Sequence, residues 1–308
     1  MGKSFRPEGV SPVRPALTNV SARYTLTGGR PESRVTLETT ERPEVLVGQD
    51  GSGNLELVLP GVACAMAAGA IPVRDGLVRQ VEVRSDGNVG TRVSIHLDHV
   101  ADYVVRSEPG LPFRTVVVVD RAHLSRLLSG RLILLDPGHG GADPGARGPI
   151  NLREREKCWE VTLFASQFLR EAGAVVMLTR RPEENPSEAL RRSLAKRRGA
   201  HLYISLHLGT GRDSAERGTA SYALGKAPDS LRLARCIHRA VLDRFPLPDR
   251  GIRTEQPVDL SLVIPAVRVE PVTLTNGLDE ALLRSPIFKR GLGLAVLTGV
   301  KDFLDGET

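Results

Sequence analysis

The sequence is poor in cysteine and in aromatic residues. Its 308 residues include three cysteines, one tryptophan and 4% aromatic residues in total. Cys64, Cys158 and Cys236 are widely spaced and odd in number, which argues against a disulfide framework, and no CxxC pair is present. Any metal ion must therefore be bound by histidine and carboxylate side chains.

A long hydrophobic run is also absent. The longest apolar stretch, residues 62–71, is half the length of the roughly 20 residues that a membrane-spanning helix needs, so no membrane span is predicted. Residues 1–20 are polar and contain prolines, whereas a secretory signal begins with basic residues followed by an apolar core. No signal peptide is visible, so the protein is expected either to be cytoplasmic or to be exported by a segment that lies outside this sequence.

Charge of one sign does not gather in a block. The 42 Lys and Arg residues outnumber the 36 Asp and Glu residues, for a net charge of +6, but they are spread along the chain. The charge therefore indicates nucleic acid only weakly, and a polyanionic surface such as a cell wall fits it equally well. We expect no nucleic-acid partner.

The first part of the chain has the pattern of half-buried antiparallel strands. Apolar residues alternate with polar ones, as Val93, Ile95 and Leu97 do, and glycine- and asparagine-rich turn signals separate the runs. We predict a small all-β sandwich over residues 23–120, after an N-terminal extension of residues 1–22.

Beyond residue 131 apolar runs alternate with longer helical segments, which is typical of an α/β fold with a mostly parallel sheet flanked by helices. The candidate strands are 132–135, 174–178, 202–206 and 266–269, with 219–224 as a candidate edge strand. The candidate helices are 154–172, 187–199, 230–245 and 286–304. Residues 131–308 would form this second domain, joined to the first by a short, partly helical linker over residues 121–130.

Three of the predicted strands end in side chains that suit a single site. The first runs into a glycine-rich loop that carries His139, the third ends at His207, and the last is followed by Glu270. Because parallel strands present the same end to one edge of a sheet, we expect these side chains to meet there.

Two imidazoles at one sheet edge suit zinc, which proteins bind through histidine, cysteine or carboxylate side chains. Glu154 is the preferred third ligand because it begins the helix after the loop of residues 145–153. Glu156 would point to a different face of that helix and is the weaker candidate. Glu270 would act as a general base that passes a proton from the attacking water to a leaving amine. The chemistry implied is metal-assisted hydrolysis of an amide.

Each of these residues alone has an ordinary structural alternative. The loop around His139 could be a structural turn or a phosphate-binding loop, and His207 could be a core histidine. Glu154 could be a carboxylate favoured at a helix N-terminus, and Glu270 an exposed charge. Only their coincidence at one edge favours the site. A solvated helix face is expected for Arg191, Arg192, Arg197 and Arg198, although one of them could bind a substrate carboxylate.

The order of these residues resembles the zinc-dependent N-acetylmuramoyl-L-alanine amidases, whose opening motif reads Leu-Asp-Pro-Gly-His-Gly-Gly. The matching segments are 135–141, Glu154, 178–180, Arg191, 204–207, 250–252, 265–270 and 275–276, which cover nearly all of 131–308 in order. The resemblance implies a twisted mixed sheet between helices, zinc bound by His139, Glu154 and His207, and Glu270 as the catalytic glutamate.

That family resemblance implies peptidoglycan as the substrate, cleaved between N-acetylmuramic acid and the L-alanine of the stem peptide, and a location at the cell envelope. Whether a protein activator is needed is left open. Residues 23–120 resemble, less specifically, the AMIN domain that precedes such amidases and often contacts peptidoglycan. A generic β-sandwich is the alternative.

The sequence departs from the family beside the predicted site. Leu208 and Gly209 follow His207 where the family has alanine and asparagine, and residues 271–273 differ as well. Two other functions therefore stay open, namely a catalytically weak or silent peptidoglycan-binding protein and a zinc peptidase for another amide. The short span from His207 to Gly218 predicts that no extra helix blocks the metal.

Overall fold

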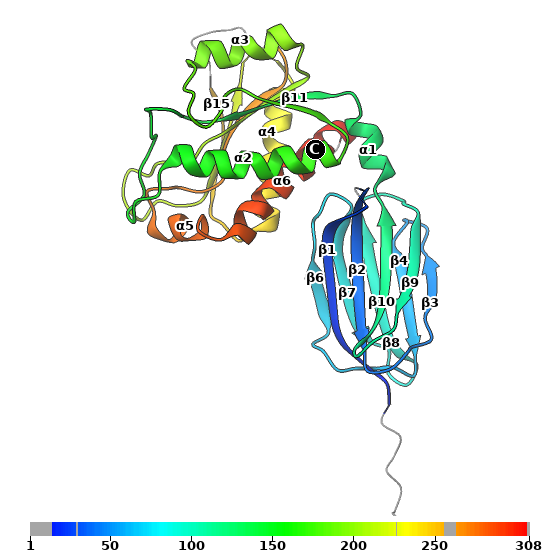
Figure 1. Cartoon of the computed structure of the whole chain (residues 1–308). Helices are drawn as coiled ribbons and strands as arrows, with labels where there is room; N and C mark the ends of the chain where they lie inside the picture. Colours follow the sequence, from blue (N-terminus) through cyan, green and yellow to red (C-terminus); the bar gives the residue numbers. More distant parts are fainter. Residues whose placement is uncertain (1–13, 29, 226, 256–262, 307–308) are drawn as a thin grey trace, which may run out of the picture. The chain divides into compact units, whose positions relative to one another are not determined.

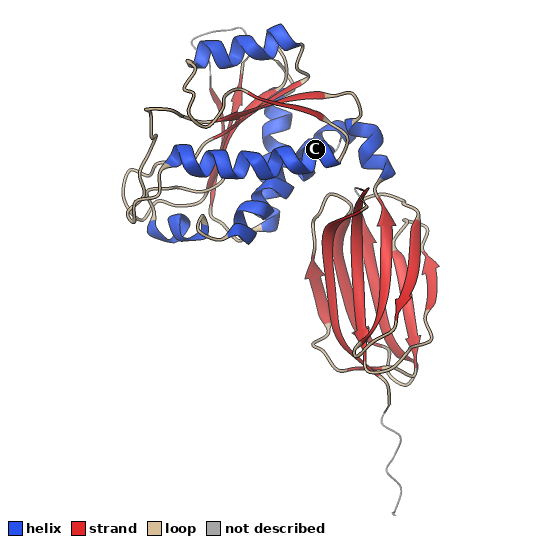
Figure 2. Ribbon diagram, viewed as in Figure 1, coloured by secondary structure: helices blue, strands red, loops and turns tan. Residues whose placement is uncertain are grey.

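The computed structural model describes residues 14–28, 30–225, 227–255 and 263–306. Their contacts divide the chain into two compact units. The first unit extends to residue 73 and resumes over 77–120, while the second contains 74–76 and everything from residue 121 onward. Figures 1 and 2 show that the described part of the first unit is built from strands and that the second combines strands with helices.

The first unit is a sandwich of two five-stranded sheets, as the alternation predicts. One sheet has the order β5-β1-β2-β10-β9 and the other β3-β4-β8-β7-β6. Their strands are β1 (Ala16–Thr27), β2 (Arg30–Thr39), β3 (Leu46–Gln49), β4 (Leu55–Pro60), β5 (Ala63–Cys64), β6 (Gly69–Pro72), β7 (Val78–Ser85), β8 (Gly90–Leu97), β9 (Tyr103–Glu108) and β10 (Phe113–Asp120). The inward-facing residues of both sheets, among them Val35, Leu57 and Ile95, form one buried core.

The sandwich begins earlier than the sequence predicted. Strand β1 starts at Ala16, so residues 16–22 are part of the sheet and not of an extension. A shift in pairing register between Leu17 and Asn19 breaks the period-two pattern, although Leu17 and Val20 are both buried. The first residues of β1 therefore lack the alternation of apolar and polar residues from which the other strands were predicted.

The second unit has an α/β fold around a mixed, mostly parallel sheet, which confirms the predicted fold class. The sheet order is β12-β11-β13-β16-β14-β15. The strands are β11 (Leu132–Pro137), β12 (Val175–Leu178), β13 (Leu202–Leu206), β14 (Thr219–Leu224), β15 (Asp249–Glu255) and β16 (Ala266–Glu270). Strand β14 runs antiparallel to β16 and is internal, so the expectation that it forms the edge was wrong. The edge is β15, whose glycine and charged residues carry no apolar run.

Helices cover the two faces of this sheet unequally, as Figure 1 shows. The helices are α1 (Ala122–Leu128), α2 (Glu154–Glu171), α3 (Glu188–Arg198), α4 (Ser230–Arg244), α5 (Gly277–Leu282) and α6 (Pro286–Asp305). Helix α3 packs on one face, where Ala195 joins a core with Leu134 and Tyr203. Helix α4 lies on the opposite face, where His238 contacts Ser221, and α6 packs against both α2 and α4.

The predicted helix ends are confirmed by their caps. The Ser187 side chain accepts a hydrogen bond from the Leu190 N–H at the start of α3, and Gly199 ends this helix in the left-handed conformation. Residues 121–130, predicted as a linker, contain α1, whose Leu124 and Leu128 are buried. This helix contacts α6 and therefore belongs to the second unit.

The hydropathy of the helices agrees with the absence of a long apolar run. Within the described residues, no helix has both the length and the apolar character to cross a membrane.

Close packing of α6 against α4 generates a stability prediction. A Cβ atom on Gly299 would lie 2.5 Å from the Cα atom and 2.8 Å from the backbone nitrogen of Ile237. Alanine favours a helix over glycine by about 1 kcal/mol, but overpacking against backbone costs about 1–3 kcal/mol. We expect Gly299→Ala to lower the free energy of unfolding by roughly 1–2 kcal/mol.

Urea unfolding followed by fluorescence can measure this change, because the single tryptophan of the chain, Trp159, lies in the second unit. Gly277→Ala is the matched control, since nothing lies within 4 Å of a Cβ placed there. Equal stability of the two variants would contradict the packing argument.

Candidate metal centre

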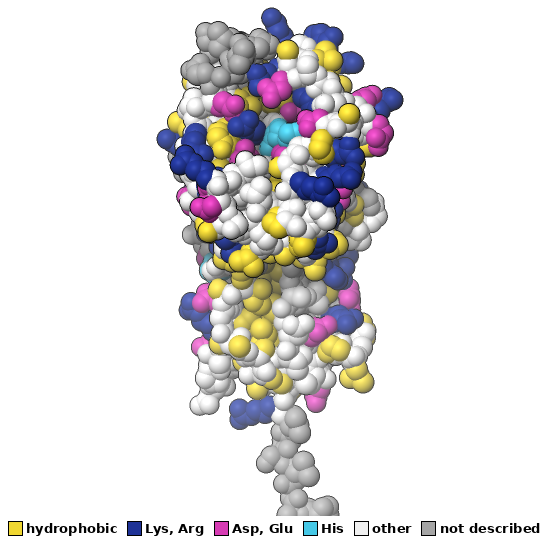
Figure 3. Space-filling view, turned by 90° about the vertical axis from the view of Figure 1, so that its left-hand side faces the viewer, with side chains coloured by type: hydrophobic (Ala, Val, Ile, Leu, Met, Phe, Trp, Pro, Cys, Tyr) yellow, Lys and Arg dark blue, Asp and Glu magenta, His cyan; other side chains and the backbone are white. Residues whose placement is uncertain are grey.

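The three predicted ligands meet at the carboxyl end of the parallel strands. His139 follows β11, His207 follows β13, and Glu154 is the first residue of α2. The Glu154 carboxylate lies between the two imidazoles, 3.0 Å from His139 Nε2 and 3.0 Å from His207 Nδ1. One candidate ligand atom from each residue lies within 4.8 Å of the others. Figure 3 shows histidine side chains reaching the surface of this unit, flanked by acidic and basic groups.

Glu154 is the most buried of the three, with 3% of its surface exposed. Besides the two imidazoles, its carboxylate accepts hydrogen bonds from the backbone N–H groups of Ala146 at 2.9 Å and Leu208 at 3.0 Å. Burial opposes the charged form, but the hydrogen bonds with His139 and His207 outweigh it and hold the pKa of Glu154 well below its usual range. The site therefore holds a buried anion suited to a cation.

His139 has a backbone conformation that residues other than glycine rarely adopt. Its backbone φ is +56°, in the left-handed region. Its Nδ1 lies 2.8 Å from the Asp143 carboxylate, which leaves Nε2 toward Glu154. The hydrogen bond with Glu154 raises the pKa of His139 to about 8, against the opposing effect of burial. A carboxylate on the outer nitrogen is the usual way in which proteins orient a metal-binding imidazole.

Two buried arginines fix the loop that carries His139. Arg180 donates hydrogen bonds to the carbonyl oxygens of Pro137 at 2.9 Å and Gly138 at 3.0 Å. Arg191 donates to the carbonyl oxygens of Pro137 at 2.8 Å and His139 at 2.7 Å. Arg191 is 5% exposed, so the predicted solvated helix face was wrong for this residue. The Arg191 guanidinium donates its hydrogen bonds to the loop and is shielded from solvent.

The Arg191 guanidinium is balanced by a carboxylate beneath the loop. Asp136 is buried and 2.9 Å from Arg191 Nη1, and it accepts hydrogen bonds from Thr179, Tyr203 and Ser205. Burial would raise the pKa of Asp136, but the Arg191 charge and these hydrogen bonds hold it below its ordinary value. The buried charge pair thus has the hydrogen bonds that make its burial tolerable.

Helix α5, which the sequence analysis did not predict, braces the loops on either side. The buried Glu280 carboxylate accepts hydrogen bonds from the Ile150 N–H at 2.7 Å and the Leu152 N–H at 2.8 Å, just before Glu154. The neighbouring Asp279 accepts from the N–H groups of Gly218 and Thr273. These two carboxylates hold the backbone that frames the metal centre.

Glu270 ends β16, the strand beside β13, and is not one of the three clustered ligands. Its carboxylate is 3.5 Å from Arg268 Nε and 3.5 Å from the Tyr222 hydroxyl. Burial raises its pKa, while the positive charge of Arg268 limits the rise, and the charges of His207 and Glu154 also act on it. The structure therefore brings Glu270 into the electrostatic environment of the His-Glu-His cluster.

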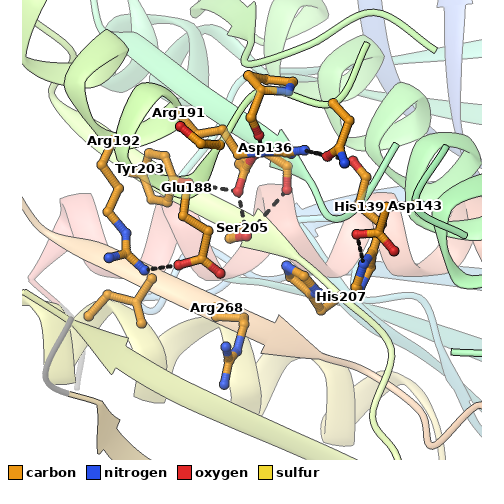
Figure 4. A pocket seen from close by; sticks show the side chains of 14 residues that line it. Asp136, His139, Asp143, Glu188, Arg191, Arg192, Tyr203, Ser205, His207 and Arg268 are labelled. Carbon is orange, nitrogen blue, oxygen red and sulfur yellow. Dashed lines mark hydrogen bonds and ion pairs between the residues drawn. The ribbon is translucent and has the colours of Figure 1, made fainter. Parts of the chain in front are cut away.

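A cavity of about 400 Å³ opens beside the histidines. His139, His207 and Asp143 lie at one end of it, and the ion pair between Glu188 and Arg192 lies at the other (Figure 4). Every residue of 208–218 is described and none is helical, so no helix from this segment covers the metal centre.

Steric crowding explains the glycine before His139. A Cβ on Gly138 would come within 2.5 Å of the His207 ring. The motif therefore needs glycine there so that the two imidazoles can approach, with ring centroids 5.0 Å apart.

The remaining candidates lie elsewhere. Glu156 pairs with Arg153 and Arg155 on the helix surface, and about half of its side chain is exposed. His238 is buried between Ser221 and Asp249, away from the cluster. The sequence analysis assigned no role to Asp143, Arg180 or Glu280. Only Asp143, four residues after His139, had a local signal.

Fold and side chains together define an α/β protein with a His-Glu-His cluster at the carboxyl edge of its sheet. A model of the N-acetylmuramoyl-L-alanine amidase family matches residues 133–302, more than half of the chain. The chain belongs to this family.

Relatives of known name agree with this assignment. The N-acetylmuramoyl-L-alanine amidase CwlM of Mycobacterium tuberculosis is 32% identical over 184 residues, which are 56% of this chain and 45% of the relative. The germination-specific N-acetylmuramoyl-L-alanine amidase of Bacillus subtilis is 26% identical over 189 residues, 56% of this chain and 79% of the relative. The chain thus spans less than half of the length of the mycobacterial relative.

Solved structures have the same fold. The catalytic domain of the amidase CwlV from Bacillus (Paenibacillus) polymyxa superposes with a TM-score of 0.52 at 26% identity, over 57% of this chain and 98% of that domain. The amidase AmiC2 of Nostoc punctiforme gives a TM-score of 0.52 at 24% identity, over 57% of this chain and 99% of its own. The family match over residues 133–302 lies in the second unit.

The choice of ligand generates a metal-binding prediction. Glu154→Ala should abolish stoichiometric zinc binding, because it removes the buried carboxylate that both imidazoles share. Glu156→Ala, the matched control two residues along the same helix, should bind zinc as the unaltered protein does. Isothermal titration with zinc at neutral pH distinguishes the two, and equal loss in both variants would refute the assignment.

Asp143 generates a second prediction. Its contact with His139 Nδ1 orients the imidazole, and loss of such an outer carboxylate typically weakens metal binding by about 10- to 100-fold. Competition with a chromogenic chelator should show this loss for Asp143→Ala. Asp213→Ala, a nearby loop variant that touches no imidazole, serves as control. Unchanged zinc affinity of Asp143→Ala would argue against the orienting role.

Proposed function

We propose that this protein is a zinc-dependent N-acetylmuramoyl-L-alanine amidase, with zinc held by His139, Glu154 and His207 and with Glu270 as the general base. The observation that carries the proposal is the convergence of two imidazoles on one buried carboxylate, with candidate ligand atoms within 4.8 Å. The donor set fits zinc, because nitrogen and carboxylate ligands without a thiolate are common at catalytic zinc sites with a position left for water.

Zinc bound by these side chains would supply Lewis acidity, lowering the pKa of water toward neutrality and polarising the scissile carbonyl. Glu270 takes a proton from the attacking water as the new C–O bond forms. It returns that proton to the amide nitrogen as the C–N bond breaks. A carboxylate with a raised pKa suits both steps, since it can hold the proton between them.

Peptidoglycan is the proposed substrate, cleaved between N-acetylmuramic acid and L-alanine, and the cell envelope is the proposed location. The family assignment and the names of the relatives support both. The first unit is proposed as an AMIN-like domain, in line with its two-sheet architecture. A protein partner is a further proposal, in line with the solved complex of the CwlD amidase from Clostridioides difficile with the GerS lipoprotein.

One alternative, a catalytically weak or silent wall-binding protein, is suggested by the departures from the family sequence at Leu208 and Gly209. The contacts of these two residues argue against it. Leu208 contributes its backbone N–H to Glu154, which any residue except proline can do. A side chain on Gly209 would come within 2.7 Å of Arg250 Nη1 and 3.1 Å of the Glu270 carboxylate, so glycine keeps this neighbourhood open. A zinc peptidase for another amide is the remaining alternative, and product analysis by mass spectrometry would distinguish it.

Digestion of purified sacculi tests the proposal. The unaltered protein with zinc should release stem peptides, and a chelator should stop the release. Glu270→Ala should reduce the rate by about 100-fold or more, the usual contribution of a general base, while the protein still binds about one zinc ion per chain.

Glu156→Ala is the control for sacculus digestion and should be fully active. Undiminished cleavage by Glu270→Ala would refute the role of this residue. Zinc-loaded protein that sediments with sacculi but releases no peptide would instead support the silent wall-binding alternative.

A further inference from the structure

A second cavity lies next to Glu270, on the side away from His139. It has a volume of about 560 Å³, and its lining residues are Thr210, Arg212, Glu216, Tyr222, Arg250 and Arg253. The Tyr222 hydroxyl is 3.5 Å from the Glu270 carboxylate, so the cavity begins at the proposed base. We call it the arginine cavity.

The strand order fixes where this cavity lies relative to the metal centre. Reading across the sheet, β11 and β13 lead to the two histidines, β16 leads to Glu270, and β14 and β15 carry Tyr222 and Arg253. Arg268, Tyr222 and Arg253 are direct neighbours in cross-strand register, so their side chains share one face of the sheet. The metal ligands, the base and the arginine cavity therefore follow one another along a single edge.

The charges in the cavity do not balance. Glu216 is the only acidic side chain among the lining residues, and it is already paired with Arg250. Within the described residues, the Arg212 guanidinium has no hydrogen bond or ion pair. In the part of the chain that the structure describes, Arg253 donates only to the neutral Tyr222 hydroxyl, at 3.2 Å. Among the described residues, these two guanidinium groups therefore lack an ion pair of their own, and the charge of Arg212 acts only on Glu216, which Arg250 already binds.

The side chains around this unbalanced charge are held in place. Arg250 donates to Thr273 Oγ1 at 2.9 Å, which ties the cavity to the loop after Glu270. The Tyr222 ring lies under the guanidinium groups of Arg253, 5.8 Å from the ring centroid, and Arg268, at 4.4 Å. Arg268 is neutralised by Glu255, 2.8 Å away. Arg212 and Arg253 are therefore the groups available to a ligand, and guanidinium is well suited to bind carboxylate.

The proposed reaction determines which part of the substrate, the leaving peptide or the acyl group, lies next to the arginine cavity. Glu270 returns a proton to the amide nitrogen, so the leaving amine must lie beside Glu270 and its peptide must extend away from it. The arginine cavity is the adjoining space. The stem peptide is the leaving group, and its glutamate, its diamino acid where present and its C-terminus can carry free carboxylates.

We infer that the arginine cavity is a subsite for free carboxylates of the stem peptide, in which Arg212 and Arg253 select anionic over amidated peptides. The inference rests on the proposed amidase function and adds a substrate preference and a direction of binding. The leaving peptide lies over β14 and β15, while the muramoyl group lies toward the cavity beside α3.

Sacculi in two chemical forms test the preference directly. One sample is left untreated, and in the other carbodiimide and ammonia convert the free carboxylates into carboxamides of nearly the same shape. The unaltered protein, at low substrate concentration, should release peptide from untreated sacculi about tenfold faster or more, the effect of losing one charge-assisted hydrogen bond. Equal rates on the two samples would overturn the subsite.

Arginine variants assign the preference to the cavity. The double variant Arg212→Gln, Arg253→Gln should cleave amidated sacculi at the unaltered rate but lose its advantage on untreated sacculi. Arg239→Gln is the matched control, since this exposed arginine lies on α4 at the opposite face of the sheet. A double variant that keeps the full preference would overturn the assignment.

The same assay separates failure of this inference from failure of the proposed function. If the zinc-loaded protein releases no peptide from untreated sacculi, the amidase function itself is refuted. Cleavage without preference refutes only the subsite. A preference that survives in Arg239→Gln and disappears in the double variant supports both.

Discussion

The Glu154 carboxylate is the interaction on which the site depends. It is buried and accepts hydrogen bonds from His139, His207, Ala146 and Leu208, which come from separate parts of the chain. Burying a carboxylate is costly unless hydrogen bonds or opposite charges compensate it. The β11 loop, the start of α2 and the end of β13 must therefore be in place together. The candidate metal site and the folding of this edge therefore depend on the same interactions.

A second layer of buried charge supports the first. Arg180 and Arg191 hold three consecutive backbone carbonyls, and Asp136 balances Arg191 from below. This bonding keeps His139 in its left-handed conformation, which a free loop would leave. Removing one member of such a network leaves a buried charge without a partner. The network therefore fixes the conformation of the His139 loop more than it adds to the free energy of unfolding.

The mixed sheet spreads the proposed chemistry along one edge. Ligands follow β11 and β13, the base follows β16, and the arginine cavity lies at β14 and β15. Since β14 runs antiparallel to β16, its first residues reach the edge where β16 ends. The reversed direction of β14 thus brings the first residues of β14 beside Glu270, whereas in a fully parallel sheet they would lie at the opposite edge.

Local patterns predicted most elements and the three candidate ligands, whose side chains the structure brings together. Apolar runs predicted the strands and helices, because this signal acts over a few residues. Only the tertiary structure decided which charges are buried and which are free. Arg191 and Arg212 look alike in the sequence, yet one binds the loop under His139 and the other faces an open cavity. Strand order and register made that difference, since they join residues far apart in the chain and leave no local signature.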